Sequence, residues 1–122
     1  DCLKIFDEIL KNITPNKKKM LELASSGYIT ATDLADYLVK NHSMSFRKAY
    51  EKTADIVNYA EKKKKNLNQL KIEELKKIEP KITTDVLRVF DLKNSINSKK
   101  SFGGTSFANI KKMIVKYKKQ ND

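Results

Sequence analysis

The sequence contains little of what would make it a disulfide-linked, membrane-spanning or β-sheet protein. It has one cysteine, three glycines, two prolines and no tryptophan in 122 residues. A single cysteine cannot form an internal disulfide bond, and no run of about 18 apolar residues indicates a membrane helix or an exported leader. We therefore expect a cytoplasmic protein with no membrane contact.

What the sequence does contain is typical of helices. Hydrophobic residues make up 39% of the chain, and its length suits one ordinary domain with a real core. Leucine, isoleucine, lysine, glutamate and alanine dominate the periodic stretches, and these residues favour helices over strands. The fold class predicted from composition is all-α.

The formal net charge is +11, which raises the possibility of a nucleic-acid partner. The basic residues are almost all lysines scattered along the chain, and Arg47 and Arg88 are the only arginines. Base reading and bidentate phosphate binding favour the guanidinium group, so a solvated lysine-rich surface is the preferred interpretation. A basic helical nucleic-acid-binding module is kept as the alternative function.

Two helices are predicted before residue 28. Residues 2–13 carry an unusually wide apolar stripe, which requires packing partners on more than one side, and we expect Cys2 to pack within it. Thr14 and Pro15 then suit the cap and first turn of a helix over residues 16–24. Its expected buried face comprises Met20, Leu21, Leu23 and Ala24. Ser25, Ser26 and Gly27 end it.

The stretch "TATDLADYLV", residues 30–39, raises the question of a polar site on a helix. Thr30 or Thr32 can cap the helix, and Asp33 and Asp36 suit its positive end, so no ligand is needed to explain them. A catalytic pair of these aspartates is disfavoured because no nucleophile or metal ligand lies nearby in sequence. His42, the only histidine, is expected to face solvent from a loop, and no metal site is predicted.

The remaining chain reads as a helical hairpin followed by shorter helices. Ser45 is predicted to cap a helix over residues 46–63. The expected buried face of this helix comprises Phe46, Ala49, Tyr50, Thr53, Ala54, Val57 and Ala60. A brief helix over 72–78 ends before Pro80, and Thr83 or Thr84 caps the next. Residues 91–104 are predicted to form an extended loop. The double glycine at 103–104 is interpreted as a turn, and Thr105 or Ser106 caps a final amphipathic helix.

The order of these pieces resembles the C-terminal domain of argininosuccinate lyase. The segments that carry the resemblance are "ATDLADYLV" from Ala31, "SFRKAYEKTADIVNYAEKK" from Ser45, "LNQLKIEELKKIEP" from Leu67, "DVLRVFDLKNSIN" from Asp85 and "SFGGTS" from Ser101. The resemblance spans about residues 20–118 in unbroken order. Lys71 departs from it, since the family often has a serine cap at this position.

The resemblance implies a compact helical C-terminal domain built around helix-turn-helix units, as in the fumarase and aspartase superfamily. It implies that residues 1–27 are the end of a long helix bundle in the central domain and that residues 28–122 are the C-terminal helical domain. The chain is then expected to be a fragment of a longer enzyme. Packing partners for the stripe over residues 2–13 are expected in the part outside this sequence.

The activity implied by the resemblance is reversible cleavage of argininosuccinate to arginine and fumarate in arginine biosynthesis. This elimination needs a base, and in the family the base lies on a mobile loop reading roughly G-S-S-x-M-P-x-K. That string does not occur here, and "SSG" at residues 25–27 has a different order. No catalytic, cofactor-binding or metal-binding residue is therefore assigned to this chain.

The leading hypothesis is a structural, noncatalytic part of argininosuccinate lyase, with other copies of the chain as partners in a homotetramer. It expects no cofactor and no nucleic acid, and it expects small-molecule substrate only in the full-length enzyme. A structural relative of the enzyme that has lost activity shares the fold and stays open as a third possibility.

Overall fold

The computed structural model describes residues 1–121, and every regular element in this range is helical. The α-helices are α1 (Cys2–Asn12), α2 (Lys17–Ser25), α3 (Ala31–His42), α4 (Phe46–Lys62), α5 (Ile72–Lys76), α6 (Leu92–Ser98) and α7 (Phe107–Asn121). Two short 3-10 helices, η1 (Leu67–Gln69) and η2 (Thr84–Arg88), lie between them. The predicted all-α fold class is confirmed.

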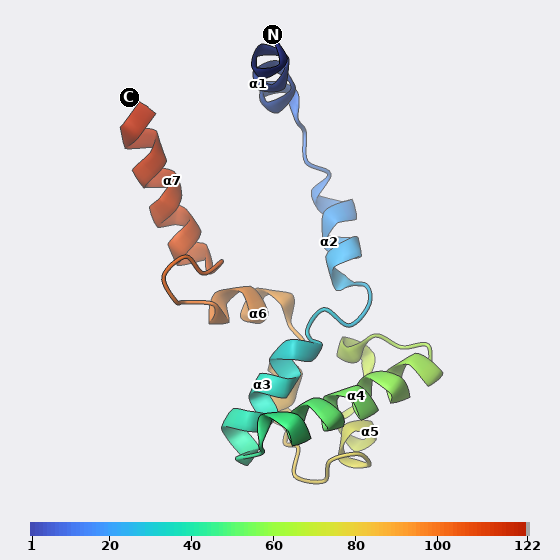
Figure 1. Ribbon diagram of the computed structural model, residues 1–122. Coiled ribbons are helices and arrows are strands. Elements are labelled where there is room, and N and C mark those ends of the chain that lie inside the picture. Colours follow the sequence, from blue (N-terminus) through green and yellow to red (C-terminus); the bar gives the residue numbers. More distant parts are fainter. Residues whose placement is uncertain (122) are drawn as a thin grey trace.

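The core lies within the segment from α3 to Phe90, two residues after η2. Its largest fully buried side chains are Leu34, Leu38, Ile56, Leu67, Leu75, Ile82 and Val86. The helices α3 and α4 form an antiparallel hairpin, and the short elements from η1 to η2 close over its inner side (Figure 1). Apolar side chains from five successive elements thus share one core, which holds the short helices in place although each is too short to be stable alone.

The hairpin turn follows from its sequence. Ser43 adopts the left-handed conformation with φ of 49°, which ends α3. The Ser45 hydroxyl then accepts a hydrogen bond from the backbone N–H of Lys48 and caps α4, as predicted.

The buried face of α4 differs from the predicted one. Ala49, Thr53 and Ala60 are buried as expected, but Phe46 and Tyr50 are 64% and 63% exposed. Ile56, which was left out of the prediction, is fully buried. The inner face of α4 is thus rotated toward positions 49, 53, 56 and 60, because the small alanines allow α4 to lie close to its neighbours while the aromatic rings stay outside.

The region predicted as an extended loop over residues 91–104 contains α6, so that prediction was wrong. The Asp91 carboxylate accepts a hydrogen bond from the backbone N–H of Asn94 at 3.0 Å and caps the helix. The side chains of α6 are mostly polar, which hid its periodicity. Its capping residue was nevertheless readable in the sequence.

Two local predictions near the N-terminus also need correction. Asn16, rather than Thr14, caps α2 by accepting a hydrogen bond from the backbone N–H of Lys19 at 3.0 Å. Cys2 is exposed rather than packed. The end of α2 is as predicted, with Ser26 as its C-cap and Gly27 at a φ of 77°.

The terminal helices α1, α2 and α7 project from the α3–α6 unit on one side (Figure 1). Within the described residues their apolar faces are largely uncovered: the exposed large side chains include Leu3, Ile5, Phe6, Ile9 and Leu10 of α1, and Met20, Leu21 and Leu23 of α2. The predicted buried face of residues 16–24 is therefore exposed at these three positions. No described helix is long and apolar enough to cross a bilayer.

Candidate functional site

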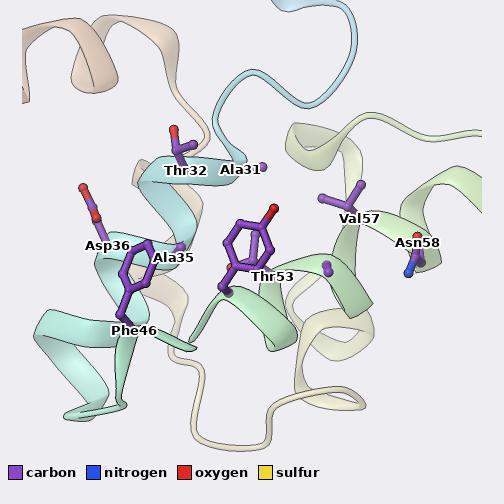
Figure 2. Close-up of a pocket in the computed structure, with 10 residues that line it drawn as sticks. Ala31, Thr32, Ala35, Asp36, Phe46, Thr53, Val57 and Asn58 are labelled. Atoms are coloured by element: carbon purple, nitrogen blue, oxygen red, sulfur yellow. The ribbon is translucent and has the colours of Figure 1, made fainter. Parts of the chain in front are cut away.

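An apolar groove runs between α3 and α4, and it has a volume of about 460 Å³. Its lining residues are Ala31, Thr32, Ala35 and Asp36 from α3, and Phe46, Tyr50, Thr53, Ala54, Val57 and Asn58 from α4. Figure 2 shows Phe46 and Asp36 near one end and Val57 and Asn58 near the other, with Thr53 between them. We call this surface the α3–α4 groove.

Thr53 lies in this groove with 5% of its surface exposed. Its hydroxyl oxygen is buried and has no hydrogen-bond partner among the described residues. A buried hydroxyl without a partner loses its hydration with no compensating bond. The position is therefore a local weak point of α4.

A polar cleft of about 490 Å³ lies on another side of α3 and is lined also by α6 and by the turn that follows it. Here the Asp33 carboxylate accepts hydrogen bonds from the Ser95 hydroxyl and from the Lys99 ammonium, the latter at 2.5 Å. The hydrogen bond to Asp33 raises the pKa of Lys99. Asp33 thus connects α3 to α6, a role that the sequence interpretation as a helix-start residue missed.

Asp36, the other aspartate of the 30–39 stretch, is exposed and lies beside both the groove and the cleft. It shares no hydrogen bond with Asp33. The two carboxylates therefore occupy different surroundings, one partly buried and ion-paired, the other in solvent. This arrangement does not resemble a paired acid and base acting on one substrate.

A second polar network joins α3 to η2. The Tyr37 hydroxyl donates a hydrogen bond to the Asp85 carboxylate at 2.9 Å, and the hydroxyl of Thr83 binds the same oxygen. Burial raises the pKa of Tyr37, and the hydrogen bond from Thr83 lowers the pKa of Asp85. Tyr37 and Thr83 are 46 positions apart in the sequence, so residue spacing could not predict this network.

His42 is the last residue of α3 and is half-buried, so its prediction as a solvent-facing loop residue was wrong. Its ring packs edge-on against Tyr37, with ring centroids 5.3 Å apart. Its Nε2 atom is buried without a hydrogen-bond partner among residues 1–121. In the same range no three His, Cys, Asp or Glu side chains gather as a metal-binding group would.

The double glycine at 103–104 forms a turn before α7, as predicted. Gly103 has a φ of 76°, which only glycine adopts without strain. A Cβ on Gly104 would lie 2.3 Å from the Lys99 carbonyl oxygen, so the close approach of the two backbone segments requires glycine. The hydroxyl of Ser106 accepts from the backbone N–H of Asn109 and caps α7, which confirms one of the two predicted caps.

Comparison with known proteins gives one consistent family. Residues 28–97 match the family described as argininosuccinate lyase C-terminal. The chain is 74% identical over 119 residues to argininosuccinate lyase of Pelagibacter ubique, which covers 98% of the chain and 26% of that protein. It is 45% identical over 117 residues to argininosuccinate lyase of Ehrlichia chaffeensis, covering 96% of the chain and 25% of the relative.

A third relative, argininosuccinate lyase of a Nitratiruptor species, is 44% identical over 112 residues, covering 92% of the chain and 24% of the relative. The chain therefore spans about a quarter of the length of the curated relatives that it matches.

Proposed function

Because the chain belongs to the argininosuccinate lyase family through its C-terminal domain, we propose that it is the C-terminal part of a longer lyase. The complete protein cleaves argininosuccinate to arginine and fumarate in arginine biosynthesis. The identity of 74% over nearly the whole chain to a protein named argininosuccinate lyase is the observation that carries this proposal.

In this proposal residues 1–27 belong to a central helical bundle, and residues 28–122 form the C-terminal helical domain. The uncovered apolar faces of α1 and α2 support the first part, because five large exposed side chains on an 11-residue helix, as in α1, need partners to leave water. The core that runs from α3 to Phe90 supports the second.

The described chain has a structural role and contributes no catalytic residue. Two of its carboxylates support this, because Asp33 and Asp85 accept hydrogen bonds that join α3 to α6 and to η2. The G-S-S-x-M-P-x-K string that carries the base of the family is also not in this sequence. The elimination chemistry then resides in the remainder of the enzyme.

The complete protein assembles as a homotetramer in the cytoplasm, and it needs no cofactor, metal or nucleic acid. Support for self-assembly comes from the exposed apolar side chains of α1 and α2, because a large exposed apolar patch commonly marks a site of protein–protein contact. A mass measurement by light scattering on the complete protein should return four times the mass of one chain.

The test of the proposed activity compares the complete protein with the 122-residue chain. With argininosuccinate as substrate, the complete protein should release arginine and fumarate in equal amounts, while the chain alone should release neither. A folded complete protein without turnover would favour the structural relative of the enzyme. Turnover by the 122-residue chain would contradict the assignment of a noncatalytic role.

The alternative function, a basic nucleic-acid-binding module, rests on the net charge of +11. Binding through lysines and phosphates should be retained at about 0.15 M salt and should weaken steeply as salt rises. Failure of the chain to shift the mobility of DNA or RNA at that salt concentration removes this alternative.

A further inference from the structure

The α3–α4 groove is unlike the rest of this lysine-rich chain. Lysine and arginine account for 26 of 122 residues, yet none of the ten residues that line the groove is basic, and Asp36 is its only charged residue. Two aromatic side chains, Phe46 and Tyr50, stand on its wall with ring centroids 6.4 Å apart and more than half of their surface exposed. Exposed aromatic residues beside an apolar groove are typical anchors of a binding surface.

The shape of the groove suits a helix as occupant. It is formed by two packed helices, and its α3 side and floor carry the small side chains of Ala31, Ala35 and Ala54, which allow a third helix to approach closely. An amphipathic helix that lays its apolar face into a groove between two helices is a common mode of recognition. A helix that carries lysines beside its apolar stripe would also match the charge of Asp36.

The helix α7 has these properties. Its apolar stripe comprises Phe107, Ile110, Met113, Ile114 and Tyr117, which are 38% to 54% exposed. Between Phe107 and Asn121 it carries five lysines and no acidic residue. By the helical repeat, Lys111 and Lys118 lie beside the stripe, so they can reach an acidic group on the rim of a groove.

The start of α7 is bound to the turn that follows α6, and from there the helix does not reach the groove of its own copy. The Asn109 side-chain amide donates to the Ser101 carbonyl oxygen at 2.8 Å, and the backbone N–H of Ser106 donates to the Lys99 carbonyl oxygen at 3.2 Å. From this anchor α7 extends away from α4 (Figure 1). An α7 helix that fills the groove must therefore come from another molecule.

We propose that α7 of a second copy of the chain occupies the α3–α4 groove. Its apolar stripe packs against Phe46, Tyr50 and Val57, and its lysines face Asp36. Because each copy has both a groove and an α7 helix, two copies related by a twofold axis make the contact twice and close the assembly. The proposal concerns this chain's own surfaces and does not depend on the lyase activity.

The first test measures the mass of the 122-residue chain by light scattering over a dilution series. The wild-type chain should change from dimer to monomer on dilution. Ala54→Arg places a large positive group in the groove, and Ile114→Asp places a charge in the stripe, so each should shift the transition to at least tenfold higher concentration. Ala108→Arg is the matched control, because this exposed alanine lies on the opposite side of α7 from the stripe.

Circular dichroism melting of each variant checks that the fold is kept, which is expected because positions 54 and 108 are both exposed on helices. A chain that is monomeric at every concentration contradicts the proposal. Self-association that Ala54→Arg and Ile114→Asp both leave unchanged also contradicts it, and then places the contact on another surface such as α1.

The second test identifies the contacting surfaces directly. In a Cys2→Ser background, one preparation carries Ala54→Cys and the other carries Ile114→Cys, and the mixture is treated with a short bifunctional thiol reagent. Cross-linked heterodimers should form, and they should be at least fivefold fewer when Ala108→Cys replaces Ile114→Cys. Equal yields from the two pairs would refute the proposed orientation of α7. In the complete protein the same cysteine pair should cross-link separate subunits.

Discussion

The unpartnered hydroxyl of Thr53 offers the sharpest test of the packing of α4. Thr53 is 5% exposed, and its hydroxyl oxygen meets no hydrogen-bond partner among the described residues. Thr53→Val keeps the branched shape of the side chain and replaces this hydroxyl by a methyl group. Since an unsatisfied buried polar group costs about 1–3 kcal/mol, removing it should stabilise the chain, by about 1 kcal/mol at the lower end of that range.

The assay is urea unfolding of the 122-residue chain followed by circular dichroism. The midpoint should rise in Thr53→Val while the slope with urea stays the same, which indicates a change in stability alone. Thr53→Ser is the matched control, because it keeps the hydroxyl and removes a methyl group. It should lose about 1 kcal/mol. A Thr53→Val variant less stable than wild type by about 1 kcal/mol or more would show that the hydroxyl has a partner, and the reasoning would be refuted.

Three further predictions concern the core, the tie to α6 and acid stability. Ile56→Ala should lower the free energy of unfolding by about 2–5 kcal/mol, because Ile56 is fully buried, and urea unfolding against an Ile96→Ala control, at a partly exposed site, measures it. Asp33→Asn removes the charge that binds Lys99, so amide hydrogen exchange should accelerate in α6 and not in α4; equal change in both helices would speak against a local tie. The pKa of Asp85 lies below its ordinary value of 3.8, so its contribution to stability is complete above that value and is lost as pH falls through the lower, folded-state pKa. Asp85→Asn should therefore make the free energy of unfolding less dependent on pH between about pH 5 and pH 2, by roughly the contribution of one titrating group. Unfolding midpoints measured across that range test this prediction.

Local signals in the sequence predicted most helix boundaries well. Ser45 and Ser106 carry capping hydroxyls, and Gly27 and Gly103 have positive φ where a helix ends or a turn is made. These features depend on residues three or four positions apart, so they can be recognised without knowledge of the fold. The same type of signal was present at Asp91, where the mostly polar α6 was nevertheless taken for a loop.

The candidate surfaces were harder to predict, because they depend on which face of a helix is buried. Periodicity alone placed Phe46 and Tyr50 in the core of α4, whereas Ile56 takes that place and the aromatic rings line the α3–α4 groove. On α4, apolar residues occupy more than one stripe. Only contact with α3, α5 and η2 decides which of these stripes is inside.

The sequence by itself determined the helical class, the caps and turns, and the family, because each is encoded in residue types and in their order along the chain. The tertiary structure alone decided that Asp33 meets Lys99 across 66 residues, that Tyr37 meets Asp85 across 48, and that α4 turns its aromatic side chains outward. Those outcomes depend on how separate helices pack. The packing energy depends on two surfaces in contact, and these come from segments far apart in the sequence, so no single stretch of sequence determines it.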